Sequence, residues 1–328
     1  MNWVAVDLGI SSIKASILDK SNKPMRLSYS MGNYETTLLS SIVVRNEQVV
    51  LGDYASLLSI LDPCAKVINW QSSNEKSLIA KTVFEAMKDA AARHYNNQNI
   101  GIVLLYNNIV DSELTSIAKE MFNEVKVMQA VDVIKRIISP NSDLMLIADF
   151  GESAFRVTLQ DRSHSLYQNS DESLGFSAFD MLSLIDCIDP SSHSSIEIAL
   201  LGQMMQRIKI LLNNGNEVYI PNKFSVKGNS IKEAFEQKMT TFLYQCFDEC
   251  SNALKAISKS WSDIEEIVFI GGGAHCNILD TVFDKYMQSQ YPLVSYNSKN
   301  SGFDAQFAVS NCAIQLPLRT NTGVVIKY

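Results

Sequence analysis

The chain contains an internal repeat. The segment VAVDLGISSIKASILD, residues 4–19, aligns without a gap with LIADFGESAFRVTLQD, residues 146–161. In each segment, turn residues separate two apolar runs, a pattern that predicts a β-hairpin. A single offset pairs Asp7 with Asp149, Gly9 with Gly151, Ser11 with Ser153, Lys14 with Arg156, Ser16 with Thr158, and Asp19 with Asp161. Two similar hairpins indicate duplicated lobes that face each other, each presenting a turn and a carboxylate to a cleft.

The length of the chain agrees with two lobes, because 328 residues exceed what a single hydrophobic core usually reaches. We expect lobe I to span residues 1–145 and to regain a returning helix at about 303–318. Lobe II is then 146–302, and a short tail, 319–328, follows.

The predicted turns are suited to a phosphate ligand. Tight turns expose successive backbone N–H groups that form an anion-binding concavity, and small residues let a phosphate approach the chain. Asp7 and Asp149 stand at the ends of the first strands, where carboxylates can hold the waters of a magnesium ion. The repeat therefore predicts a site for a magnesium-bound nucleotide.

A third segment, IVFIGGGAHCNILD, is rich in glycine. It predicts a strand over 267–270, the three glycines Gly271, Gly272 and Gly273, and a helix from about Asn277. Glycines between a strand and a helix permit a close approach by a flat ligand or a phosphate, and the helix N-terminus favours negative charge. The spacing matches neither a dinucleotide fingerprint nor a P-loop.

Composition excludes several classes of protein. A net charge of −7 and a pI near 5.2 argue against nucleic-acid binding, which requires clustered basic residues. No apolar run reaches the roughly 18 residues of a membrane span, and the N-terminus lacks the pattern of a targeting segment, so we expect a soluble, cytoplasmic protein. The six cysteines show no zinc-ligand spacing, which favours reduced, buried thiols.

The three loops, Asp7-x-Gly9, Asp149-x-Gly151 and Gly271-Gly272-Gly273, resemble in order and spacing the phosphate 1, phosphate 2 and adenosine motifs of the actin, sugar kinase and heat-shock chaperone superfamily. Within it, the chain is most similar to the nucleotide-binding domain of the heat shock protein 70 family. LGFSAFDMLSLI resembles a Leu-Gly-Gly-x-x-Phe-Asp segment of that family, and DAQFAVSNCAIQ resembles its final helix. The resemblance covers roughly residues 3–316, but only the loops are specific.

The resemblance implies an α/β fold of the two-lobed, actin-like ATPase type, with duplicated ribonuclease-H-like domains and a nucleotide cleft. It implies ATP or ADP with Mg²⁺ as ligands. Asp7 and Asp149 would then lie around the metal, through water, and Lys66 would take the place of the catalytic lysine. The residues placed at the nucleotide are Gly9, Ser11, Ser12, Gly151, Ser153, Gly175, Lys209, Asn213, Gly271, Gly272, Gly273, His275 and Asp304.

The chain departs from the family in its second phosphate loop. The usual Asp-x-Gly-Gly-Gly-Thr is replaced by DFGESA, so that Glu152, Ser153 and Ala154 stand where the family has two glycines and a threonine. Phe176 also replaces the second glycine of the Leu-Gly-Gly segment. A carboxylate about 4 Å from a phosphate costs roughly 1 to 4 kcal/mol. We therefore expect nucleotide binding with weak or absent hydrolysis.

Only LPLRTNTGVVIKY follows the last helix of the resemblance, so we expect no peptide-binding domain. Three functions stay open: a nucleotide-gated chaperone-like or regulatory switch with a protein partner, an actin-like filament protein of the plasmid-segregation or cell-shape type, and a scaffold that binds no nucleotide. The apolar end, residues 321–328, is expected to be a docked strand or a partner-binding peptide.

Overall fold

The computed structural model describes most of the chain, and it divides into two units. One unit is Met1–Pro140 with Phe307–Tyr328, and the other is Asn141–Gln306. The expected roles of Ser11, Lys209, Asn213 and the tail fall outside the described residues. The residues that the structure describes are 1–9, 12–31, 34–36, 38–39, 41–62, 65–67, 69–107, 110–138, 142–162, 164–180, 194, 197–198, 231–292 and 304–316.

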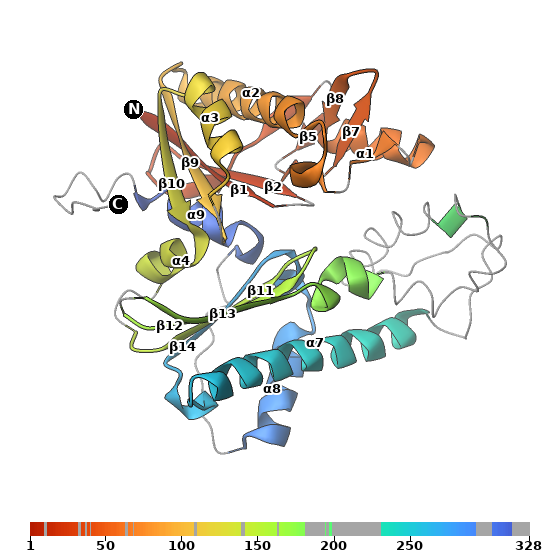
Figure 1. Ribbon diagram of the computed structural model, residues 1–328, viewed down its shortest axis with the longest axis vertical. Coiled ribbons are helices and arrows are strands. Elements are labelled where there is room, and N and C mark those ends of the chain that lie inside the picture. Colours follow the sequence, from red (N-terminus) through yellow and green to blue (C-terminus); the bar gives the residue numbers. More distant parts are fainter. Residues whose placement is uncertain are drawn as a thin grey trace. The chain divides into compact units, whose positions relative to one another are not determined.

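The first unit is built on a mixed sheet with the strand order β10-β9-β1-β2-β3, of which Figure 1 labels the first four strands. β6 also pairs with β2. β1 is antiparallel to β2 and parallel to β9, which is in turn parallel to β10. The strands are β1 (Asn2–Leu8), β2 (Ile13–Leu18), β3 (Pro24–Arg26), β6 (Leu38–Leu39), β9 (Ile100–Tyr106) and β10 (Glu124–Gln129).

Helices cover both faces of this sheet. α2 (Lys76–Tyr95) and α3 (Ser112–Met121) pack on one face, and α4 (Ala130–Ile138) and α9 (Ala308–Ala313) pack together on the other (Figure 1). Consecutive residues of β1 are therefore buried although their side chains point in opposite directions: Val4, Ala5 and Val6 are all 0% exposed. The central strand that carries Asp7 is thus held from both sides.

Shorter elements complete the first unit. They are β4 (Tyr29–Met31), which pairs with β5 (Tyr34–Thr36), β7 (Ile42–Arg45), which pairs with β8 (Gln48–Leu51), α1 (Gly52–Leu61), and the 3-10 helices η2 (Trp70–Ser72) and η7 (Ala305–Phe307), the latter at the boundary of the units.

The second unit repeats the central arrangement of the first. Its sheet has the order β13-β12-β11-β14, in which β11 is antiparallel to β12 and parallel to β14. β11 therefore has the same kinds of neighbour as β1, and both predicted hairpins are confirmed. The elements are β11 (Met145–Phe150), β12 (Phe155–Gln160), β13 (Ser165–Asp171), η3 (Glu172–Leu174), α7 (Ile231–Ala256), η5 (Trp261–Asp263), β14 (Glu266–Ile270), η6 (Gly272–His275) and α8 (Leu279–Gln290).

Aromatic side chains fill the core of the second unit between its sheet and α7 and α8. The centroid of the Phe247 ring, on α7, lies 6.4, 6.1 and 4.9 Å from the ring centroids of Phe150, Phe269 and Phe283, respectively. The apolar residues of α7 therefore pack in the interior, as their helical spacing predicts. This core fixes β11, which carries Asp149, against β14, which leads into the three glycines.

The cysteines of α7 are structural. Cys246 and Cys250 are fully buried, and burial raises the pKa of both thiols. The described residues contain no cluster of three or more His, Cys, Asp or Glu side chains able to hold a metal ion. In the same part of the chain, no helix combines the length and apolarity needed to cross a bilayer.

Candidate functional site

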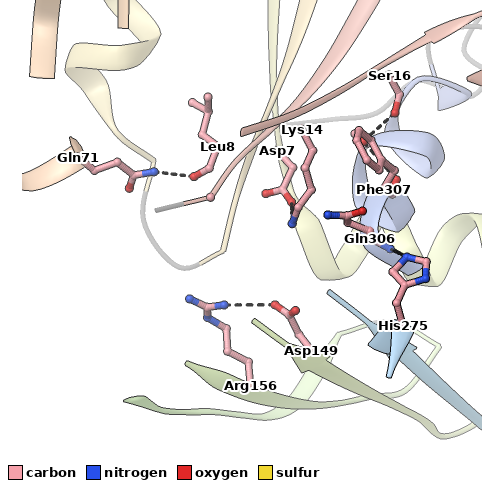
Figure 2. Close-up of polar contacts among 12 residues, drawn as sticks. Asp7, Leu8, Lys14, Ser16, Gln71, Asp149, Arg156, His275, Gln306 and Phe307 are labelled. Carbon is pink, nitrogen blue, oxygen red and sulfur yellow. Dashed lines mark hydrogen bonds and ion pairs between the residues drawn. The ribbon is translucent and has the colours of Figure 1, made fainter. Parts of the chain in front are cut away.

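The turn between β1 and β2 joins an aspartate to a basic residue. Asp7 lies directly opposite Lys14 in the hairpin register, and Lys14 Nζ is 3.4 Å from Asp7 Oδ2 (Figure 2). The side chains of Lys14 and Asp7 are 12% and 20% exposed. Charge pairs directly across an antiparallel ladder are favourable, so the register of the hairpin itself places the ammonium beside the carboxylate.

Gly9 makes this turn possible. A Cβ on Gly9 would lie 2.4 Å from the carbonyl oxygen of Ser12, closer than any side chain can approach. The turn is also tied to η2. Gln71 Nε2 donates to the Leu8 carbonyl at 2.5 Å (Figure 2). Trp70 Nε1 donates to the Gly9 carbonyl at 3.1 Å. The carbonyls of Leu8 and Gly9 are therefore both engaged by side chains from outside the hairpin.

Lys66 lies on the chain segment that leads into η2. It forms an isolated antiparallel bridge with Val43 of β7, and the next residue, Val67, donates its N–H to the Ile42 carbonyl at 2.9 Å. Its side chain is half-buried. The structure thus attaches Lys66 to β7, four residues before the Trp70 that holds the Gly9 turn.

The turn between β11 and β12 has the same construction in the second unit. Asp149 lies opposite Arg156 in the register, and Arg156 Nη1 donates to Asp149 Oδ2 at 3.2 Å (Figure 2). A Cβ on Gly151 would lie 2.7 Å from the Ala154 carbonyl oxygen, which repeats the relation between Gly9 and Ser12. The sequence repeat is therefore also a repeat of turn geometry and of charge pairing.

A neighbouring segment packs directly on this second turn. The Phe176 N–H donates to the Gly151 carbonyl at 3.1 Å, and both the N–H and the hydroxyl of Ser177 donate to the Glu152 carbonyl at 2.9 Å. A Cβ on Gly175 would lie 2.6 Å from the carbonyl carbon of Ser153. Gly175 is required by this close backbone approach.

The residues that replace the family's glycines and threonine differ in burial. Ala154 is 2% exposed, so its methyl group belongs to the interior. Glu152 and Ser153 are half-buried at the turn. No side-chain hydroxyl follows Ser153 in this turn.

The three consecutive glycines have three different environments. Gly271 has a φ of 90°, and a Cβ at this residue would lie 2.5 Å from Asp149 Oδ1. The Asp149 carboxylate therefore lies against the backbone of Gly271. Gly272 is exposed, and a Cβ there would meet nothing within 4 Å. A Cβ on Gly273 would lie 2.0 Å from the ring of Phe176. Packing thus accounts for Gly271 and Gly273, and only Gly272 has open space beside it.

His275 is held at the end of η6. Its Nε2 accepts a hydrogen bond from the Gln306 backbone N–H at 3.2 Å (Figure 2). Asp304 Oδ1 lies 3.6 Å from the same nitrogen. His275 and Asp304 are brought together, as neighbours of the Gly272 loop.

Each unit therefore gathers its own part of the expected set. In the second unit, Asp149, Gly151, Ser153, Gly175 and Gly271 adjoin one another. Sequence reasoning paired Lys14 with Arg156 but gave neither a role, and it gave none to Trp70 and Gln71. The hairpin registers place Lys14 opposite Asp7 and Arg156 opposite Asp149. Predicting these registers from the sequence could therefore have identified both basic residues.

Each of the two aspartates expected around a magnesium ion has a basic neighbour: Lys14 Nζ lies 3.4 Å from Asp7 Oδ2, and Arg156 Nη1 lies 3.2 Å from Asp149 Oδ2. A carboxylate has two oxygens and about four lone-pair sites, so one such ion pair is compatible with the waters of a magnesium ion. The magnesium site stays a prediction.

Comparison with known proteins finds a distant similarity. No family model matches the chain. The chain is 19% identical over 265 residues to the chaperone protein HscA of Buchnera aphidicola subsp. Baizongia pistaciae (strain Bp), a match that covers 74% of this chain and 50% of that protein. The chain spans about half the length of this relative. The similarity relates the chain distantly to a chaperone.

Proposed function

We propose that the protein binds an adenine nucleotide and acts as a nucleotide-gated chaperone-like or regulatory switch. One observation carries the proposal: an Asp-x-Gly turn of the same geometry and register ends the central strand of each unit. The distant similarity to a chaperone supports it, as does the resemblance of the three loops to the heat shock 70 family. The two units would be the lobes of an actin-like ATPase fold.

The parts of the site would divide the nucleotide between them. Backbone N–H groups of the Gly9 and Gly151 turns would bind phosphate oxygens, together with Ser11, Ser12 and Ser153. The open side of Gly272 would face the ribose or the base. His275 and Asp304 would belong to the adenine side of the site, and the resemblance assigns Lys209 and Asn213 to the same side.

Hydrolysis would be weak or absent. Rapid phosphoryl transfer needs preorganised groups that stabilise the charge developing on the terminal phosphate. Here the buried methyl of Ala154 would stand in the place of a hydroxyl, and Lys66 would take the role of the catalytic lysine. The output of such a protein is a change in partner affinity between nucleotide states, which requires only that the partner bind one state more tightly.

Isothermal titration calorimetry of the full chain tests the proposal. ATP and ADP should each give saturable heat, and GTP should bind more weakly because the base side of the site is proposed to read adenine. Gly272→Val should weaken ATP binding without lowering the melting temperature, since a side chain there enters open space. Absence of heat and of thermal stabilisation at millimolar ATP and ADP would contradict the proposal.

A further inference from the structure

We infer that Phe176 is a positioning residue that joins the turn between β11 and β12 to the glycine loop, so that a phosphate bound at the turn and a nucleoside bound at the loop strengthen each other's binding. The turn is residues 151–154, and the glycine loop is residues 271–273. Both belong to the second unit. The inference rests on the proposed function and deepens it, because it names what makes two parts of the same site act together.

The backbone around Phe176 is fixed to the turn. The Phe176 N–H donates to the Gly151 carbonyl at 3.1 Å, and the N–H and the hydroxyl of Ser177 both donate to the Glu152 carbonyl at 2.9 Å. The preceding residue, Gly175, is so close that a Cβ on it would lie 2.7 Å from the Glu152 carbonyl oxygen. A movement of the turn therefore carries residues 175–177 with it.

The ring of Phe176 is fixed to the glycine loop. A Cβ on Gly273 would lie 2.0 Å from Cε2 and 2.5 Å from Cζ of Phe176, so the ring occupies the space that a side chain at 273 would need. The other sides of the ring are packed as well: Phe176 is 3% exposed, and its ring centroid lies 5.1 Å from that of Phe242 and 6.0 Å from that of Phe179. Because interiors are close-packed, a displacement of this ring is transmitted to its neighbours.

This link is a property of the particular residues at 176 and 273. The resemblance aligns Phe176 with a glycine of the Leu-Gly-Gly segment, and a glycine has no side chain that could reach the loop. The large ring at 176 and the missing Cβ at 273 are complementary in shape. The link adds to the one that β11 and β14 supply, where Asp149 pairs with Ile270.

A link of this kind makes binding at the two places cooperative. A ligand that orders the turn also orders part of the glycine loop, so a second ligand at the loop loses less conformational entropy when it binds. Linkage requires that the effect be reciprocal, because the coupling free energy belongs to the pair of sites. ATP, which carries both chemical parts in one molecule, would gain from the same coupling.

Calorimetric titration of adenosine into the full chain, with and without saturating inorganic tripolyphosphate, tests the inference. In the wild type, tripolyphosphate should lower the Kd for adenosine by about fivefold or more, and in Phe176→Leu, which keeps the N–H but removes the ring, the ratio should fall to about 1. Phe235→Leu is the matched control, since it makes the same change at a buried ring that packs against Phe179 at a centroid distance of 5.5 Å, and it should keep the wild-type ratio.

Hydrogen exchange with tripolyphosphate alone locates the effect. In the wild type and in Phe235→Leu, exchange should slow in both peptides, residues 146–161 and 267–277. In Phe176→Leu, it should slow only in residues 146–161, because the turn still binds the anion but no longer orders the loop.

The outcomes separate the inference from the function on which it rests. Saturable ATP binding together with equal adenosine ratios in the wild type and in Phe176→Leu overturns the inference and leaves nucleotide binding intact. ATP binding without a response of residues 267–277 to tripolyphosphate in the wild type also overturns it. Absence of binding of ATP, adenosine and tripolyphosphate overturns both. If circular dichroism shows that Phe176→Leu is not folded, Phe176→Met, which also lacks the ring, takes its place.

Discussion

Replacing Gly273 by alanine tests the finding that this glycine serves packing. The new Cβ would lie 2.0 Å from Cε2, 2.5 Å from Cζ and 2.7 Å from Cδ2 of Phe176. The ring cannot move aside easily, because it is 3% exposed and packs against Phe179 and Phe242 at centroid distances of 6.0 and 5.1 Å. Overpacking of a buried site costs about 1–3 kcal/mol of unfolding free energy.

That cost is large enough to measure. For a domain of 150–250 residues, each kcal/mol lowers the melting temperature by roughly 2–4 °C, so Gly273→Ala should lower it by about 2–12 °C. Gly272→Ala is the matched control, since its Cβ would meet nothing within 4 Å, and we expect a change within about 0.5 kcal/mol. Thermal and urea denaturation of the full chain, followed by circular dichroism, supply both values.

A second substitution identifies the clash. Phe176→Leu removes the ring, so the double variant Gly273→Ala/Phe176→Leu should lose less stability than the sum of the two single variants. Equal stability of Gly273→Ala and Gly272→Ala would refute the reasoning, as would strict additivity in the double variant.

Three further predictions concern stability, turnover and assembly. Asp111→Ala removes the N-cap of α3 and the ion pair with Lys76, and should cost about 1 kcal/mol in urea denaturation at pH 7. Desolvation raises the pKa of Asp111, but Lys76 and two backbone N–H groups lower it overall, so the difference from the wild type should shrink as the pH falls below about 4; a constant difference would contradict this. Phosphate release from ATP should be slow, and Glu152→Gly with Ser153→Gly and Ala154→Thr should raise it; fast release by the wild type would contradict the assignment of the second loop. The protein should stay in the supernatant when centrifuged at high speed with ATP, whereas nucleotide-dependent pelleting would favour a filament.

Local features of this fold could be predicted from the sequence. Both hairpins are predicted by apolar runs that turn residues interrupt. Their registers are strongly specified, because a one-residue shift would turn every core side chain to the opposite face of the sheet. The strand before the three glycines and the helix after them follow from the same kind of pattern. The structure gives the strand as Glu266–Ile270 and starts the helix at Leu279, two residues after the expected start.

Features that depend on distant residues could not be predicted in this way. Gly273 matches a ligand loop in sequence, but its requirement comes from Phe176, which is far away in the chain and adjacent in space. The hydrogen bond from Trp70 to the Gly9 carbonyl is also long-range. The resemblance assigns all three glycines to ligand binding, whereas packing against Asp149 and Phe176 accounts for Gly271 and Gly273 without a ligand.

Hydrogen exchange of the full chain with and without saturating ATP tests the central claim most directly. The account predicts slower exchange in three separate peptides, residues 4–19, 146–161 and 267–277, because these contain the two turns and the glycine segment. Peptides from the buried middle of α7 should be unchanged and serve as an internal reference. Unchanged exchange in all three peptides at saturating ATP would contradict the claim that this repeat forms a nucleotide site.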